Sequence, residues 1–215
     1  MSALDQAFSK AISEGFADIF TVPKISTATI VCVLPRQINL EMVRDNSGLN
    51  VRTSKGKRYQ PFSNSVTIIF DKTKTMKVFS NGKLHITGCT SVEYAESLVE
   101  RFKINMGFES LAIKETKVLM LNTTLRIQPQ KMISLTKMFE ILSKESKFHV
   151  RYTPDIYQGL IIKKEVPNEI RRVSFLFFYT GSIIICGIKF PQDLSFALEF
   201  LKDLLHNILP HIVVS

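Results

Sequence analysis

Cysteine is scarce in this chain of 215 residues. The three cysteines, Cys32, Cys89 and Cys186, are an odd number, stand far apart and form no CxxC pair. This pattern argues against a disulfide framework and against a zinc site, and it fits a reducing environment. The first twenty residues carry three acidic side chains and lack a long apolar run, so they do not resemble a secretory signal.

A membrane-spanning run is also missing. The longest uncharged apolar stretch, residues 173–188, has 16 residues between Arg172 and Lys189, whereas a spanning helix needs about 20. Thr180, Gly181 and Ser182 interrupt it, and it is rich in Phe and Ile. These features predict a buried β-hairpin, and we expect no membrane partner.

Recognisable catalytic motifs are absent as well. The four histidines fall on different predicted elements, without HExxH, and there is no GxSxG, phosphate-binding GxxxxGK[ST] or dinucleotide-binding GxGxxG loop. No carboxylate pair stands in a recognisable motif. We therefore expect a protein that is not an enzyme and has no cofactor, no metal site and no small-molecule substrate.

Positive charge is what the chain has in excess. Its 28 Lys and Arg outnumber its 19 Asp and Glu, which gives a net charge of +9 and a pI near 9.5. Such a balance is typical of proteins that bind nucleic acid, because basic side chains neutralise phosphates and release counterions. Charge alone leaves open the alternative of a merely basic protein.

The chain also contains an internal repeat. Residues 79–88 read Phe-Ser-Asn-Gly-Lys-Leu-His-Ile-Thr-Gly, and residues 178–187 read Phe-Tyr-Thr-Gly-Ser-Ile-Ile-Ile-Cys-Gly. Each copy predicts the end of one strand, a turn closing on Gly, a second strand and a terminal Gly, with a helix following. A repeat of this size determines architecture.

We divide the chain into three parts on this basis. Residues 1–22 form a predicted amphipathic helix with an apolar stripe, which either docks on the body of the protein or binds a partner; the stripe is Phe8, Ile12, Phe16 and Phe20. Residues 23–110 are the first repeat and residues 111–215 the second. In each repeat the predicted order is strand, helix, four strands, helix. The first of the four strands in the first repeat is a short one at residues 49–52.

The predicted fold class is α+β, with ten antiparallel strands and four helices on one face. The other face of the sheet then stays open, and an open apolar face with aromatic residues marks an interaction surface. Strand alternation places on it Ile25, Thr27, Phe79, His85, Thr87, Val118, Met120, Leu176, Phe178, Ile184 and Cys186.

Two stretches resemble the TATA-box-binding protein family. Residues 78–88, Val-Phe-Ser-Asn-Gly-Lys-Leu-His-Ile-Thr-Gly, resemble the family's Ile-Phe-Ser-Ser-Gly-Lys-Met-Val-x-Thr-Gly. Residues 152–161, Tyr-Thr-Pro-Asp-Ile-Tyr-Gln-Gly-Leu-Ile, resemble its Tyr-Glu-Pro-Glu-Leu-Phe-Pro-Gly-Leu-Ile. The resemblance covers residues 23–209. Its divergence resembles that of homologues encoded by large DNA viruses.

The resemblance implies a saddle-shaped sheet with helices on its convex face and a role as a transcription initiation factor. It implies binding of double-stranded, A·T-rich DNA in the minor groove, and bending by aromatic wedges between base steps, for which this family is itself the type example. The implied wedges are Phe62, Phe79, Tyr157 and Phe178. The implied groove-lining residues are Ile25, Thr27, His85, Thr87, Thr116, Val118, Leu176 and Ile184.

Phosphate contacts and protein partners follow from the same resemblance. The candidates for phosphate contact are Lys55, Lys57, Arg58, Lys83 and Lys163. Tyr152, Asp155 and Ile156 fall where the family binds the B-type general initiation factor, and assembly with RNA polymerase would follow. The implied location is the nucleus or a cytoplasmic viral replication compartment.

Several residues depart from the family pattern. The family's central Asn pair falls on Pro23 and Thr116, and one wedge has become Tyr157. A groove-lining Val and Leu have become His85 and Lys77. These changes predict DNA bending with a weaker or shifted sequence preference. They also leave open a protein-interaction scaffold that no longer binds DNA specifically.

Overall fold

The computed structural model describes residues 19–52, 64–128 and 131–214. Most of the predicted N-terminal helix, together with Phe62, Lys55, Lys57 and Arg58, therefore lies outside the described residues. Phe20, the last residue of the predicted apolar stripe, is buried and forms an isolated bridge with Ile127. The chain divides into two compact units, a first unit of Thr27–Met120 and a second unit of Met1–Ser26 with Leu121–Ser215.

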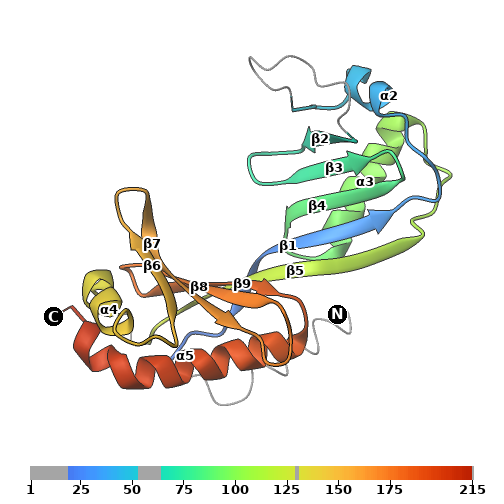
Figure 1. Cartoon of the computed structure of the whole chain (residues 1–215). Coiled ribbons are helices and arrows are strands. Elements are labelled where there is room, and N and C mark those ends of the chain that lie inside the picture. Colours follow the sequence, from blue (N-terminus) through green and yellow to red (C-terminus); the bar gives the residue numbers. More distant parts are fainter. Residues whose placement is uncertain (1–18, 53–63, 129–130, 215) are drawn as a thin grey trace. The chain divides into compact units, whose positions relative to one another are not determined.

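The described strands form an antiparallel sheet in the order β2-β3-β4-β1-β5-β9-β8-β7-β6 (Figure 1). The predicted α+β class is thus confirmed, with nine strands in the described residues instead of ten. The missing one is the short strand predicted at residues 49–52. There Val51 makes only an isolated bridge to Ile68, because the amide of Val51 turns back to the carbonyl of Leu49.

The first unit holds most of β1 (Lys24–Val33), and also α2 (Leu40–Asp45), β2 (Ser65–Ile69), β3 (Thr75–Phe79), β4 (Lys83–Cys89) and α3 (Val92–Met106). One side of its strands packs on α3, and the side chains buried there alternate along each strand: Ile30, Cys32, Met76, Val78, Leu84 and Ile86. Helix α3 begins where Ser91 Oγ accepts a hydrogen bond from the amide of Tyr94, and it ends at Gly107 in the left-handed region.

The second unit holds the latter half of β5 (Glu115–Arg126), and also α4 (Leu135–Leu142), β6 (His149–Thr153), β7 (Tyr157–Glu165), β8 (Arg172–Phe177), β9 (Ser182–Ile188) and α5 (Pro191–Ile212). The apolar stretch 173–188 forms the β8–β9 hairpin, as predicted. Its alternate side chains, Val173, Phe175, Phe177, Ile183 and Ile185, are buried. Within the described residues, no helix combines the length and apolarity needed to cross a membrane.

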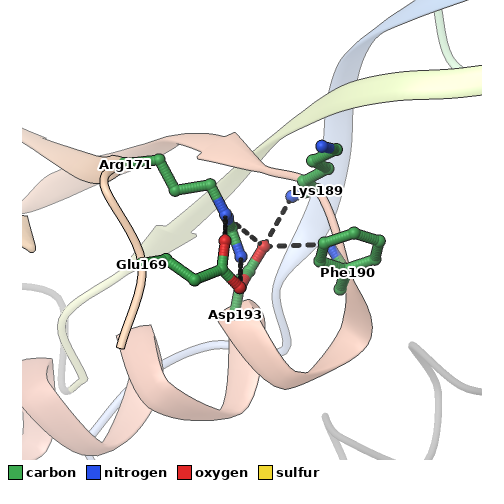
Figure 2. Close-up of polar contacts among 5 residues, drawn as sticks. All are labelled: Glu169, Arg171, Lys189, Phe190 and Asp193. Carbon is green, nitrogen blue, oxygen red and sulfur yellow. Dashed lines mark hydrogen bonds and ion pairs between the residues drawn. The ribbon is translucent and has the colours of Figure 1, made fainter. Parts of the chain in front are cut away.

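A buried ion pair fixes the start of α5 (Figure 2). Asp193 is 2% exposed, and its Oδ2 accepts hydrogen bonds from the amides of Lys189 (2.8 Å) and Phe190 (2.9 Å). Arg171 donates to both carboxylate oxygens of Asp193, at 2.7 and 2.5 Å, and also pairs with Glu169. Burial raises the pKa of Asp193, but the donors outweigh it, so the net pKa is lowered. The pair ties the helix to the residue preceding β8.

The sequence repeat is also a repeat of backbone geometry. On β1 the register skips Gly88, because Ala28 pairs with Cys89 and Thr29 with Thr87. On β5 it skips Gly187 in the same way. The two glycines have φ of +88° and +91°, which favour residues without Cβ. A Cβ on Gly88 would lie 2.1 Å from the carbonyl oxygen of Thr73. Each second hairpin strand thus ends in a glycine bulge.

Candidate nucleic-acid interface

The face of the first unit that α3 does not cover presents a mixed polar and apolar surface. Across β1, β4 and β3, one row is Val31, His85 and Lys77, and the next is Thr29, Thr87 and Thr75. The hydroxyls of Thr75 and Thr87 lie 2.9 Å apart. Thr27 belongs to the same alternate set of β1 and is half-buried. The predicted residues Thr27, His85 and Thr87 therefore come from adjacent strands of one face.

A cationic and aromatic cluster lies on this face. The rings of Phe79 and His85 lie 4.9 Å apart, tilted by 54°, and Lys77 Nζ is 5.5 Å from the Phe79 ring centre. Burial, followed by the charges of Lys77 and Lys83, lowers the pKa of His85 below its ordinary 6.5. The lowered pKa favours the neutral imidazole, and the cluster's positive charge comes mainly from the lysines.

The corresponding face of the second unit is more apolar at its centre. Thr124, Ile184, Leu176 and Ile161 form one row across β5, β9, β8 and β7, and Asn122, Cys186, Ser174 and Lys163 form the next. Both rows end on β6, at Arg151 and His149 respectively. The predicted residues Leu176 and Ile184 lie directly opposite each other. Lys163 is exposed and belongs to a basic margin at the β6 edge.

An aromatic pair stands at one end of this second face. Tyr157, the first residue of β7, and Phe178, just after β8, meet edge to face with ring centres 6.2 Å apart. Gly159 leaves the space that the pair occupies. A Cβ on Gly159 would lie 2.7 Å from Cε1 of Tyr157 and 3.2 Å from Cε1 of Phe178. Tyr157 remains 38% exposed, so two predicted wedge positions are brought together at the surface.

The turn between β6 and β7 carries the residues predicted to bind a protein partner. Tyr152 is half-buried, with its ring 6.3 Å from that of Phe139 on α4. Asp155 is exposed, and Ile156 is 80% exposed. The amide of Ile156 donates to the carbonyl of Thr153 and closes the turn. An exposed aliphatic side chain is thus held on a short, ordered turn.

Thr116 and Pro23 fall at the family's central Asn positions, and neither side chain is exposed. Thr116 Oγ1 donates to Glu96 Oε1 of α3 at 2.7 Å and lies 3.7 Å from the buried sulfur of Cys32. Thr116 is thus engaged with the helix-covered side of the first unit and is not grouped with His85 and Thr87. Pro23, at the other central position, is buried. Ile25 and Val118 are each half-buried on their strands.

Several residues of these faces are not among those predicted from the sequence. Thr29, Thr75, Thr124, Ile161 and Arg151 lie in the same rows as the predicted ones. Their positions alternate with buried residues on strands that the sequence predicts. Strand alternation, carried across every predicted strand, would have found them.

Comparisons with known proteins agree with this geometry. The family model described as "Transcription factor TFIID (or TATA-binding protein, TBP)" matches residues 22–106 and 127–208. The chain is 24% identical to the TATA-box-binding protein of Methanococcus aeolicus over 185 residues, which are 84% of this chain and 92% of that protein. It is 26% identical to TATA-box-binding protein 2 of Methanosarcina acetivorans over 136 residues, which are 61% of this chain and 68% of that protein.

A viral relative and a solved structure complete the comparison. The chain is 24% identical to the TATA-box-binding protein-like protein of Acanthamoeba polyphaga mimivirus, over 85% of this chain and 64% of that protein. The structure of the Methanococcus jannaschii TBP matches with a TM-score of 0.63 and 19% identity, covering 86% of this chain and 98% of that one. The chain belongs to the TATA-binding protein family of transcription factors, as a divergent member.

Proposed function

We propose that this protein binds double-stranded DNA in the minor groove through the open faces of its two units and bends A·T-rich promoter DNA. The observation that carries the proposal is the pair of exposed Tyr157 and half-buried Phe178 above Gly159. Aromatic side chains with room to stand at the end of an open sheet face are suited to enter between base pairs. The role is one of binding, without catalysis or a cofactor.

The chemistry of the two faces fits this ligand. The minor groove of A·T pairs offers acceptors at adenine N3 and thymine O2 and no amino group. Apolar residues such as Leu176 and Ile184 would lie along its floor, with Ile25 in the same role. The hydroxyls of Thr27 and Thr87 would donate to the acceptors. Exposed Lys83 and Lys163 would contact phosphates, as would Lys57 and Arg58 from the loop outside the described residues.

Bending would come from unstacking base steps. Inserting a side chain costs a few kcal/mol per step, and the larger protein surface that bent DNA covers offsets this cost. Phe79 would act in the first unit, with Phe62 assigned the same role, and Tyr157 with Phe178 in the second. Flexible pyrimidine–purine steps unstack most easily, so a preference for TA steps can persist without base hydrogen bonds.

The bound protein would then nucleate assembly of the initiation complex. Tyr152 packs on α4 and positions the turn, and Asp155 and Ile156 would contact a B-type general initiation factor, which brings in RNA polymerase. The proposed location is the nucleus or a cytoplasmic viral replication compartment.

Energy transfer between the ends of a short duplex with a central TA-rich site tests the proposal. The full chain is compared with a Phe79→Ala/Phe178→Ala variant and with Tyr94→Ala, which removes an exposed aromatic from α3. We expect saturable bending by the intact chain and by Tyr94→Ala, lost in the double variant. Equal binding by all three proteins without bending would reduce the DNA role to phosphate attraction.

A protein-interaction scaffold is the second candidate function. Two observations favour it: Thr116 uses its hydroxyl on Glu96, and Pro23 has no amide hydrogen to donate. Both central positions therefore lack a donor for base edges. A chain that fails to bind the duplex at 50 mM salt and still binds the B-type factor would establish this alternative.

A further inference from the structure

His85 occupies the middle of the first unit's open face. Its strand β4 lies between β1 and β3, with Val31 opposite on one side and Lys77 on the other. The ring packs against Phe79 at 4.9 Å. Among the described residues, no hydrogen bond holds either ring nitrogen. An imidazole with both nitrogens uncommitted therefore lies beside a proposed wedge.

The groups that face His85 are basic or uncharged. Lys77 comes from β3 and Lys83 from β4 itself, while β1 presents Val31 with Thr29 and Val33. These three strands carry no Asp or Glu. The ring is partly buried, and burial and both lysines hold its pKa down in the free protein. Nothing on these strands favours the imidazolium before a ligand binds.

The second unit lacks this cluster at the equivalent positions. With the offset of 99 residues between the two hairpins, Lys77 corresponds to Leu176, Lys83 to Ser182 and His85 to Ile184. All three charged or titratable side chains are thus replaced by neutral ones. The second repeat therefore has no side chain at these positions that could take up a proton as His85 could.

We propose that DNA binding protonates His85, so that this residue makes binding pH-dependent and distinguishes the two halves of the site. The inference rests on the proposed function. Phosphates near Lys77 and Lys83 would neutralise the charges that now repel a proton. The imidazolium then donates one N–H to a minor-groove acceptor, with the proton drawn from solvent. Because only the first unit acquires a charge, its half of the site would favour the narrow, most negative stretch of an A·T tract.

The sign of the pH effect follows from linkage. If the pKa of His85 is higher in the complex than in the free protein, binding tightens as the pH falls through the interval between the two pKa values. The free value lies below 6.5. Each unit by which DNA raises it strengthens binding by up to about tenfold as the pH falls through the interval between the two pKa values.

Fluorescence anisotropy of a labelled A·T-rich duplex, from pH 5.5 to 8 at one ionic strength, tests the inference with the full chain. His85→Gln keeps a donor but cannot titrate, so we expect its affinity to match the intact chain at pH 8 and to stay flat below. His85→Val removes the donor as well and should be flat and weaker throughout. The control His206→Gln, on exposed α5, should keep the pH dependence of the intact chain.

A nuclear magnetic resonance titration of the His85 ring protons, with and without duplex, gives a second readout. A higher pKa in the complex supports the inference. An intact chain that binds DNA with no pH dependence beyond that of His85→Gln, or an unchanged ring pKa, overturns it and leaves the proposed function standing. An intact chain that fails to bind at every pH overturns both.

Discussion

Gly159→Ala should separate DNA bending from folding. The added Cβ would lie 2.7 Å from Cε1 of Tyr157 and 3.2 Å from Cε1 of Phe178, so the aromatic rings must move. Tyr157 is 38% exposed and able to swing toward solvent. The substitution therefore displaces a proposed wedge without opening the core.

The expected change in stability is small. Losing the edge-to-face contact costs about 0.5–1.5 kcal/mol. Gly159 does not have a positive φ, so alanine fits its backbone and restricts the unfolded chain, which returns about 0.4–1 kcal/mol. The net change is about 1 kcal/mol or less, equal to a melting shift of roughly 2–4 °C for a chain of this size. The equilibrium constant for forming the bent complex, in contrast, should fall at least about tenfold, a loss of about 1.4 kcal/mol in binding free energy.

A double-mutant cycle with Tyr157→Ala shows whether Gly159 acts through Tyr157. Urea unfolding and duplex bending are measured for both single variants and the double variant. If Gly159 only positions Tyr157, the double variant bends DNA no worse than Tyr157→Ala alone. Normal bending by Gly159→Ala, or losses that simply add, would refute the reasoning.

Three further outcomes are expected. Asp193→Asn should lower the free energy of unfolding by about 1.5–3 kcal/mol, because it weakens the charge-assisted hydrogen bonds between a buried carboxylate and Arg171. Folding lowers the pKa of Asp193, so its carboxylate stabilises the fold fully above about pH 3.9, the unfolded value. This stabilisation is lost in acid as the pH falls through the folded pKa. Urea unfolding at several pH values measures both the cost of the substitution and its pH dependence. Tyr157→Phe should bend DNA at least as well as the intact chain in the energy-transfer assay, because it removes a hydroxyl that must be desolvated between bases; weaker bending would give the hydroxyl a positive role. Ile156→Asp should prevent the B-type factor from binding the protein–DNA complex. In a gel-shift assay the slower band of the three-component complex should disappear while the protein–DNA band persists. Loss of both bands would contradict a role of Ile156 confined to partner binding.

The sequence predicts the second unit's hairpin well because its signals are local. An apolar stretch alternating around a Gly turn specifies β8 and β9, and Ser91 with Gly107 bounds α3. Proline is a poor guide to the end of α5: the helix continues through Pro210 to Ile212, although Pro210 cannot donate to the carbonyl four residues before it.

The placement of Thr116 shows where local signals fail. Its partner Glu96 lies 20 residues away on α3, and only the packing of that helix on the sheet brings the two together. Alternation along one strand shows which of its residues share a side of the sheet. It does not show which side chain of a packed helix a threonine contacts. The Phe79–His85 contact, in contrast, joins neighbouring strands of one hairpin and follows from the turn between them.

The two bulge glycines bear on how relatives of this chain are to be interpreted. Gly88 and Gly187 are required by their positive φ and by the carbonyl oxygens of Thr73 and Arg172 close to them, whatever the face of the sheet binds. A lineage that gave up promoter recognition would still have to retain them. The two glycines are thus required by the architecture, whereas His85 and Tyr157, proposed to contact DNA, carry no such backbone requirement. We therefore expect relatives of different binding function to share the two glycines and to differ at positions such as His85 and Tyr157.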